Sequence, residues 1–168
     1  DRRANPRNDL ASVIANGQIE GKPLGHLEAM SYYIIAATAG HDTTSNTTAG
    51  GMWALAQNPD QFAKVKADLS LIPGLVEESI RWETPVKHFM RSATADAEVA
   101  GQKIAKGDWL MLSYPSGNRD EAAFTDPFKF DIERSPNKHV AFGYGAHVCL
   151  GQHLGRMEMR VLWEELLP

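Results

Sequence analysis

The residues best suited to chemistry lie in one short stretch, FGYGAHVCLG, at positions 142–151. This stretch contains Cys149, the only cysteine among 168 residues, together with three glycines. Glycines at this spacing predict a tight loop whose backbone approaches another group closely. We expect Cys149 to lie in the first turn of the following helix, where free amide groups and the helix dipole stabilise a thiolate. A thiolate held in this way suits a single soft axial ligand to a haem iron.

Other roles for this cysteine stay open, the simplest being an inert buried thiol in a glycine turn. A zinc site could use His147, Cys149 and His153, because Cys and His ligate zinc at such spacings, but a clear second pair of ligands is missing. A hydrolase could use Cys149 as its nucleophile and His147 as the base. Residues two apart at a helix start rarely align as such a pair, and no acid nearby would orient the histidine.

A second unusual stretch, TAGHDTTS at 38–45, falls inside a helix that we expect over Leu27–Gln57. Serine, threonine and asparagine compete for backbone hydrogen bonds and weaken a helix interior, which points to a functional reason for them. Residues 36, 40, 43 and 47 are small and share one face, and this predicts a trough for a flat macrocycle and a diatomic gas. Threonine hydroxyls there could bond to carbonyl groups one turn back and open a local bulge that admits water. A close crossing between two helices is the alternative.

The rest of the chain predicts a mainly α fold with a small antiparallel β-sheet. Asn58, Pro59 and Gln61 predict a helix start with a capping box, and another helix is expected from near Pro73 to Thr84. Strands are expected at 86–92, 98–99, 103–104 and 109–113, with the middle two forming a hairpin. Residues 115–137 show little periodicity. The last helix, expected from near Cys149, carries on one face Leu150, Leu154, Met157 and Val161.

Composition excludes several classes of protein. A net charge of −4 gives no basic footprint for nucleic acid, and the longest apolar run is far shorter than the roughly 20 residues of a membrane-spanning helix. A single cysteine excludes an internal disulfide framework and suits a reducing cytoplasm. The chain begins without methionine and stops at WEELLP, just after an amphipathic helix. We therefore interpret residues 1–168 as the carboxy-terminal part of one domain whose amino-terminal half and final tail are missing.

The cysteine stretch resembles the haem-binding loop of the cytochrome P-450 superfamily, F-G-x-G-x-H-x-C-x-G, at every fixed position. The resemblance implies that Cys149 is the axial thiolate ligand of haem b, iron protoporphyrin IX. It also implies that His147 donates a hydrogen bond to a haem propionate and that Phe142 packs beside the thiolate. The cofactor-binding glycines of the loop would be Gly143, Gly145 and Gly151.

TAGHDTTS resembles the superfamily's distal-helix motif, A/G-G-x-D/E-T-T/S. By this resemblance Thr43 and Asp42 are catalytic residues that supply protons during oxygen activation. Ala39 and Gly40 would contact the cofactor, and Ala36, one turn earlier, would contact substrate.

Two further motifs match the superfamily. Glu78 and Arg81 match E-x-x-R, and although such an i,i+3 pair is usually a surface contact, the resemblance implies a buried structural network with Arg134 as third partner. In VKHFMR, Arg91 would pair with a propionate, because a guanidinium fork suits a carboxylate, or else it is an ordinary exposed strand arginine. Val86 and Phe89 are our candidates for substrate contact.

The resemblance covers the chain in order, from distal long helix through E-x-x-R helix, meander and cysteine loop to proximal helix. It is strongest to the soluble bacterial class, in particular the monoterpene-alcohol (α-terpineol) hydroxylase type. The implied activity is insertion of one oxygen atom of dioxygen into a C–H bond of a small apolar substrate, such as a terpenoid, alkane or aromatic hydrocarbon. Electrons would come from a ferredoxin and its NAD(P)H-dependent reductase. Arg156 and Arg160 are candidate docking charges or solvated side chains. A haem-thiolate peroxygenase or gas-binding protein is the alternative.

Overall fold

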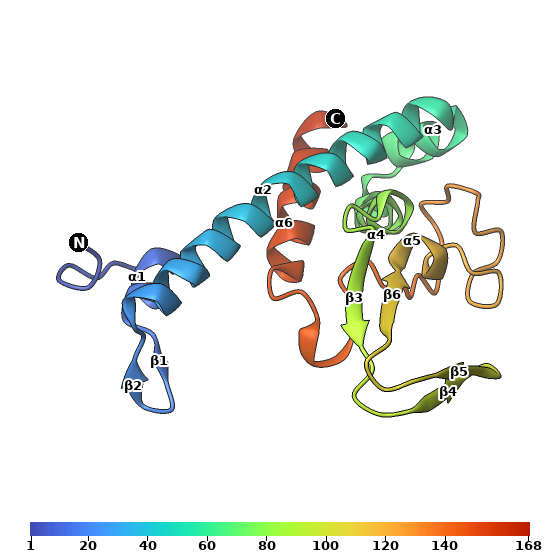
Figure 1. The fold of residues 1–168 in the computed structure, drawn as a ribbon. Helices are drawn as coiled ribbons and strands as arrows, with labels where there is room; N and C mark the ends of the chain where they lie inside the picture. Colours follow the sequence, from blue (N-terminus) through green and yellow to red (C-terminus); the bar gives the residue numbers. More distant parts are fainter. The chain divides into compact units, whose positions relative to one another are not determined.

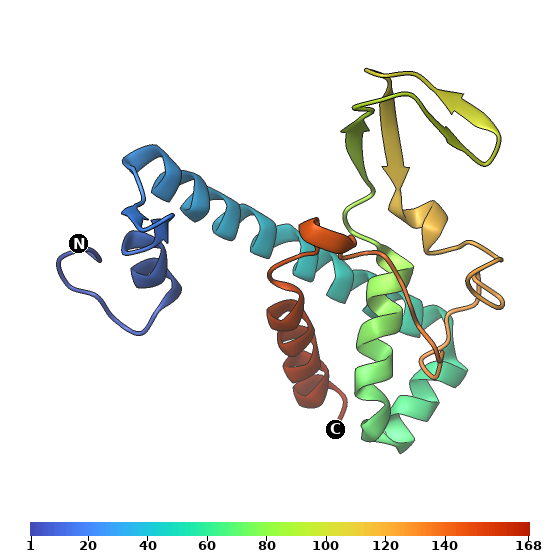
Figure 2. The ribbon, with the colours of Figure 1, turned by 90° about the horizontal axis from the view of Figure 1, so that it is seen from below.

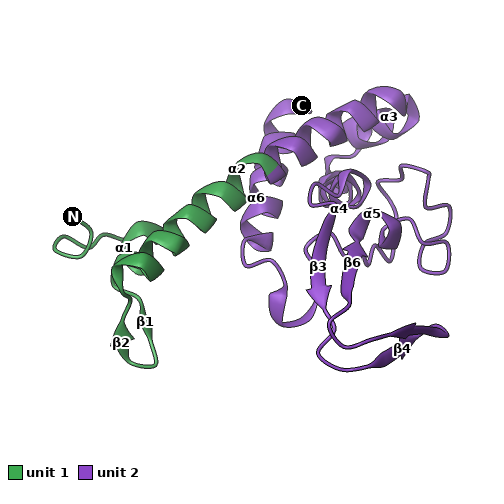
Figure 3. Cartoon of the chain, viewed as in Figure 1, with its two compact units in different colours: residues 1–42 green, residues 43–168 purple.

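The computed structural model describes residues 1–168, and Figure 1 shows its elements in chain order. The chain divides into two compact units, residues 1–42 and residues 43–168, which Figure 3 colours separately. The boundary falls within the long helix α2 (His26–Gln57). None of the helices combines the length and the apolar character needed to cross a membrane.

The first unit contains two small elements that the sequence did not predict. Helix α1 (Leu10–Ala15) begins after Asp9, whose carboxylate accepts the N–H of Ser12 at 2.7 Å. Strands β1 (Gln18–Ile19) and β2 (Lys22–Pro23) form a two-residue antiparallel hairpin. These elements are too short to produce the periodic apolar pattern on which a sequence prediction depends.

Helix α2 confirms the long helix expected near 27–57 and begins one residue earlier. The hydroxyls of Thr47 and Thr48 donate to the carbonyl oxygens of Thr43 and Thr44, at 2.7 and 2.8 Å. The predicted hydroxyl-to-carbonyl bonds are therefore confirmed, but the predicted bulge is wrong, since every residue from 26 to 57 is α-helical. A carbonyl oxygen has two lone pairs, so it can accept a hydroxyl while it keeps its amide partner.

The core of the second unit lies among α2, α3 (Pro59–Ala67), α4 (Ile72–Glu83) and α6 (Gln152–Leu166), with a 3₁₀ turn, η1 (Leu69–Leu71), before α4. Figure 2 shows α6 running alongside α4. The buried apolar residues of this core are Ala54, Leu55, Val65, Ile72, Leu75, Val76, Ile80, Phe130, Ile132, Ala141, Met159, Trp163 and Leu167.

Two details of the helices differ from the sequence prediction. Helix α3 begins where expected, but Asn58 makes no side-chain cap and donates instead to Ala54 O at 2.8 Å. Gln61 is buried, and its Oε1 accepts the N–H of Ile132 at 3.1 Å, so the predicted capping box does not form. Helix α6 begins three residues later than expected, and it buries Met159 and Trp163. The apolar stripe that the sequence marks on this helix is exposed at Leu154, Met157 and Val161.

The strands confirm the predicted antiparallel pairing, although they form separate pairs rather than one sheet. Strand β3 (His88–Ser92) pairs with β6 (Trp109–Ser113), and β4 (Ala97–Val99) pairs with β5 (Gln102–Ile104). A short helix, α5 (Tyr114–Gly117), follows β6. The irregular meander after it crosses α4 so closely that a Cβ on Gly74 would lie 2.1 Å from the carbonyl oxygen of Ile132.

Candidate functional site

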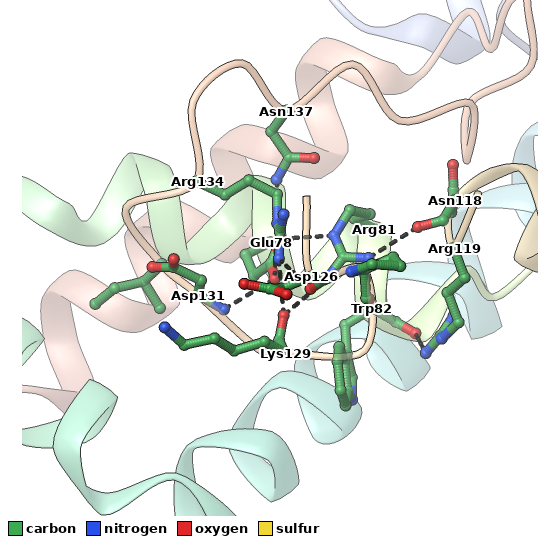
Figure 4. A network of polar contacts seen from close by, with 12 residues as sticks. Glu78, Arg81, Trp82, Asn118, Arg119, Asp126, Lys129, Asp131, Arg134 and Asn137 are labelled. Carbon is green, nitrogen blue, oxygen red and sulfur yellow. Dashed lines mark hydrogen bonds and ion pairs between the residues drawn. The ribbon is translucent and has the colours of Figure 1, made fainter. Parts of the chain in front are cut away.

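A fully buried arginine organises the centre of the second unit (Figure 4). The side chain of Arg81 is 0% exposed, and its guanidinium makes a bidentate pair with Glu78, at 2.8 Å from Nε to Oε2 and 2.7 Å from Nη2 to Oε1. Its remaining N–H groups donate to the carbonyl oxygens of Asn118, Pro127 and Lys129. All five guanidinium N–H groups thus have acceptors, which is the condition under which a buried charge is tolerated.

Glu78 is equally buried and receives further donors. The Nε of Arg134 lies 3.2 Å from Glu78 Oε2, so the structure brings together the three residues that the sequence assigned to this network. The amide of Asp131 and the Nδ2 of Asn137 also donate to Glu78, at 2.9 and 3.0 Å. The network therefore fixes the meander to α4, immediately before the cysteine loop begins.

The cysteine loop is folded around glycines with left-handed backbone. Gly143 and Gly145 have φ values of +74° and +72°, which side chains with a Cβ rarely adopt. The N–H of Cys149 donates to the carbonyl oxygen of Phe142 at 2.8 Å and closes the loop. The prediction that Cys149 lies in the first turn of the helix is wrong, because α6 begins at Gln152 after the cap residue Gly151. A 3₁₀ turn, η2 (Gly145–His147), comes before the cysteine, and residues 149–151, where the helix was expected to start, form a non-helical turn.

The loop presents its cysteine beside an open surface. Cys149 is a free, half-buried thiol, while Tyr144 and Leu150 are 90% and 97% exposed. A Cβ on Gly145 would meet no atom within 4 Å, and one on Gly151 would lie 4.0 Å from the sulfur. No group of three His, Cys, Asp or Glu side chains in the structure could hold a metal ion, so the zinc alternative gains no support. A single soft ligand beside open space with apolar neighbours fits a haem.

Comparison with known proteins decides the family. A family profile described as "Cytochrome P450" matches residues 66–168. The chain belongs to the cytochrome P-450 family. It is 53% identical over 168 residues to cytochrome P-450-terp of a Pseudomonas species, covering 100% of this chain and 39% of that protein. It is 42% identical to a steroid C26-monooxygenase of Mycobacterium tuberculosis, covering 99% of this chain and 45% of that protein.

Solved structures confirm the fold class. The crystal structure of CYP108D1 from Novosphingobium aromaticivorans matches with a TM-score of 0.93 at 58% identity, covering 99% of this chain and 40% of that one. The chain thus spans about two fifths of the length of the relatives that it matches. Membership of the cytochrome P-450 family implies a haem cofactor.

The family's distal-helix residues lie on α2. In the first unit, Ala36 is half-buried, whereas Ala39, Gly40 and Asp42 are exposed, and the Oδ1 of Asp42 lies 3.6 Å from the Nε2 of His41. A Cβ on Gly40 would meet no atom within 4 Å.

In the second unit, Thr43 is half-buried on the same helix. The hydroxyl of the neighbouring Thr44 would lie 3.6 Å from a Cβ on Gly155, which places α2 in contact with α6 six residues after Cys149.

The strand residues stand on an exposed pair of strands. Arg91 is exposed, donates to the carbonyl of Met90 at 2.9 Å and takes part in no ion pair. Together with Met90, Ser92 and Trp109 it lines a shallow hollow of about 210 Å³. Phe89 is half-exposed, with its ring 6.0 Å from that of Tyr114. Val86 precedes β3 in a bend, so the alternation of strand faces does not place it relative to Phe89.

Sequence reasoning missed one cluster, centred on Glu77. Its carboxylate pairs with Arg156, at 2.6 Å from Nε to Oε1, and accepts a hydrogen bond from His139 Nε2 at 3.1 Å. Burial alone would raise the pKa of Glu77, but the bonds from His139 and Arg156 outweigh it and lower the pKa to about 2. Arg156 is therefore held in an ion pair, so the solvated side chain that the sequence offered as one alternative is wrong for this residue, and its role as a docking charge stays a prediction. The tandem Glu77-Glu78 on an amphipathic helix is the signal that could have revealed the cluster.

Arg160, the other candidate docking charge, is also paired. Its Nε lies 2.6 Å from Glu164 Oε1 in an exposed i,i+4 contact on α6. Such contacts are weak and exchange readily with solvent. The structure therefore supports the solvated role that the sequence offered as an alternative for this residue.

Proposed function

We propose that this chain is the carboxy-terminal part of a haem-thiolate monooxygenase, in which the thiolate of Cys149 would hold the haem iron. The observation that supports the proposal most strongly is the loop itself. Its two left-handed glycines and the Cys149 amide bond to Phe142 hold one free thiol beside open space. When bound, haem b would supply dioxygen activation, with the thiolate pushing electron density that favours O–O cleavage.

The residues around the loop have distinct roles in this proposal. Arg91 and His147, both exposed, would donate hydrogen bonds to the haem propionates. Gly143, Gly145 and Gly151 would let the macrocycle approach the backbone. Support comes from Gly145, where a Cβ meets nothing, whereas a Cβ on Gly143 would lie 3.4 Å from the hydroxyl of Tyr114. The network of Glu78, Arg81 and Arg134 does no chemistry and holds the segment that leads into the loop.

We propose that α2 supplies protons and substrate contacts. Asp42 exchanges protons with solvent through its exposed carboxylate, and Thr43 passes them on by its hydroxyl. The small residues Ala39 and Gly40 leave space for the cofactor. Ala36, Val86 and Phe89 contact the substrate.

The proposed substrate is a small apolar molecule such as a terpenoid, an alkane or an aromatic hydrocarbon. Relatives differ in this respect, since one similar protein is named a steroid C26-monooxygenase. Electrons would come from NAD(P)H through a ferredoxin reductase and a ferredoxin. A cytoplasmic location is proposed, because a reducing compartment keeps the single cysteine, Cys149, from being oxidised.

A carbon monoxide difference spectrum tests the proposal. The complete protein that carries these 168 residues, loaded with haem and reduced, should show a strongly red-shifted Soret band under carbon monoxide. Cys149→Ser should lose the red shift, because a hydroxyl cannot replace the thiolate donor, while His153→Ala should keep it. Haem bound without a red shift in the unaltered protein would contradict thiolate ligation.

A haem-thiolate peroxygenase or gas-binding protein is the alternative, and Thr43 distinguishes it. Thr43→Ala should retain the red-shifted band yet divert electrons from product to hydrogen peroxide when a ferredoxin system drives the reaction. Ser45→Ala, at an exposed position of the same helix, serves as the control. Unchanged coupling in Thr43→Ala would remove the proton role and favour the alternative.

A further inference from the structure

Three segments that are distant in sequence meet at the carboxylate of Glu77. This residue lies on α4, its partner Arg156 lies on α6, and His139 belongs to the segment just before the cysteine loop. The Nη2 of Arg156 also reaches Glu77, at 3.1 Å from Oε2, so the guanidinium is held in two places. Two donors on one carboxylate fix the relative positions of α6 and the loop's leading segment.

His139 depends on this carboxylate. Its side chain is only 3% exposed, and its second ring nitrogen, Nδ1, is buried without a hydrogen-bond partner. The bond to Glu77 is thus the one polar contact that orients the buried imidazole. Losing it would leave both ring nitrogens unsatisfied, which is costly inside a protein.

The same two partners of Glu77 enclose the ring of Phe142. The Cζ of Arg156 lies 4.5 Å from the centre of that ring, and the ring of His139 lies 5.9 Å away, tilted by 50°. A guanidinium at this distance attracts the face of an aromatic ring, and tilted ring pairs are also favourable. The Phe142 side chain is therefore positioned by two groups that Glu77 itself positions.

Phe142 connects this cluster to the sulfur-bearing residue. Its carbonyl oxygen accepts the N–H of Cys149 at 2.8 Å. From this chain of contacts we infer that Glu77 is a positioning residue for Cys149, acting through Arg156, His139 and Phe142. The inference deepens the proposed function, because it concerns the orientation of the thiolate that would hold the haem.

The chain offers a matched control on the same helix. Arg160 lies one turn beyond Arg156, and its Nε–Oε1 distance to Glu164 is also 2.6 Å. This second pair is exposed and makes no contact with an aromatic ring or with the loop. Substitutions in the two pairs remove the same chemical groups from α6 but should differ in their effect on the cysteine loop.

Amide hydrogen exchange, measured on the complete haem-loaded protein, tests the inference directly. Glu77→Gln should speed exchange in residues 142–151 by about tenfold, the effect of one lost charge-assisted hydrogen bond on local opening. Exchange in residues 157–166 of α6 should not change. Arg156→Lys, which keeps the charge but loses the planar group over Phe142, should accelerate the same loop to a smaller extent. If Glu77→Gln does not fold, the result for Arg156→Lys decides the outcome.

The controls Glu164→Gln and Arg160→Lys should leave exchange in 142–151 unaltered. Equal acceleration along all of α4 and α6 would show that Glu77 is merely structural, and an unaltered loop in Glu77→Gln would overturn the inference.

A second readout separates this inference from the proposed function. In Glu77→Gln the ferrous carbon monoxide complex should lose its red-shifted Soret band several times faster than in Glu164→Gln, since the thiolate is less firmly placed. Equal rates in the two variants would count against the positioning role. Absence of that band in the unaltered protein would refute the proposed haem ligation, and the exchange pattern would still decide whether Glu77 positions Cys149.

Discussion

The E-x-x-R network and the cysteine loop place opposite demands on the chain. Glu78 and Arg81 are completely buried, and every N–H of the arginine has an acceptor. The loop around Cys149 is half-buried or exposed and closes on a few backbone hydrogen bonds. The buried charged network is thus a densely hydrogen-bonded scaffold, whereas the candidate chemistry lies in a more exposed segment.

This difference shows why a buried charged network belongs beside a reactive loop. The loop needs open backbone where a cofactor would lie, so it cannot stabilise itself by packing. Its position must therefore come from neighbouring segments. Two consecutive residues of α4 provide these contacts: Glu78 binds the meander through Arg134, and Glu77 binds His139 and Arg156. Substitutions in the E-x-x-R network should therefore lower the free energy of unfolding of the whole protein. Substitutions in the cysteine loop should change hydrogen exchange mainly in the loop itself.

The largest effect is expected for Arg81→Ala. Removing the guanidinium takes away the bidentate partner of the buried Glu78 and leaves Arg134 as its only cationic partner. Breaking a buried pair in this way costs about 3–5 kcal/mol of the free energy of unfolding. That is a large share of a typical stability of roughly 5–15 kcal/mol. Urea unfolding of the complete protein, followed by circular dichroism, gives the value. Arg160→Ala should have the same free energy of unfolding as the unaltered protein. Similar losses in the two variants would contradict the difference between a buried and an exposed arginine.

Gly74→Ala tests how closely the meander is held against α4. The new methyl group would approach the carbonyl oxygen of Ile132, and backbone on both sides cannot yield easily. Overpacking of this kind costs about 1–3 kcal/mol, which the same unfolding measurement would detect. Gly40→Ala meets open space on a helix and is the matched control. A stabilised Gly74→Ala would show that the crossing is looser than described.

Gly145→Ala sharpens the other side of the comparison. No atom obstructs the new methyl group, so the cost of about 1–2 kcal/mol comes only from the left-handed backbone. We expect faster hydrogen exchange in residues 142–151 and little change elsewhere. Faster exchange in α4 as well would mean that the loop helps to stabilise the E-x-x-R network.

The contribution of Glu77 to stability should depend on pH. The pKa of its carboxyl is lowered to about 2 in the folded protein from an ordinary 4.5. Its ionised form therefore stabilises the fold above about pH 4.5, and this contribution is lost as the pH falls towards 2. The unfolding free energy of Glu77→Gln should vary less with pH in that window than that of the unaltered protein. Parallel curves would contradict the assigned pKa.

Local pattern and motif predicted much of the fold. The long helix, the helix before Thr84, the hairpin and the mainly α class follow from periodicity and turn residues. The contact between Arg134 and Glu78 depended on the resemblance, because 56 residues separate the two. Gln61 shows the limit of local rules, since a distant amide, that of Ile132, uses the oxygen that a capping box would need.

The tandem Glu77-Glu78 marks the position of the other cluster, but the partners of Glu77 could not be predicted for the same reason. Its ion pair joins residues 79 apart, and nothing in the spacing of Arg156 from Cys149 distinguishes it from Arg160. Only the packing of α6 against α4 determines which arginine turns inward. The start of α6 was likewise misplaced, because residues 149–151 form a non-helical turn and the helix begins only at Gln152.

The way in which the meander is bound sets limits on how it can evolve. Arg81 and Arg134 contact it through main-chain oxygens, at positions 118, 125, 126, 127 and 129. Most side chains along this stretch can therefore be exchanged without disturbing the contact, whereas adding or deleting one residue would bring the wrong oxygens to the two arginines. We expect this segment to tolerate wide variation in its residues and almost none in its length.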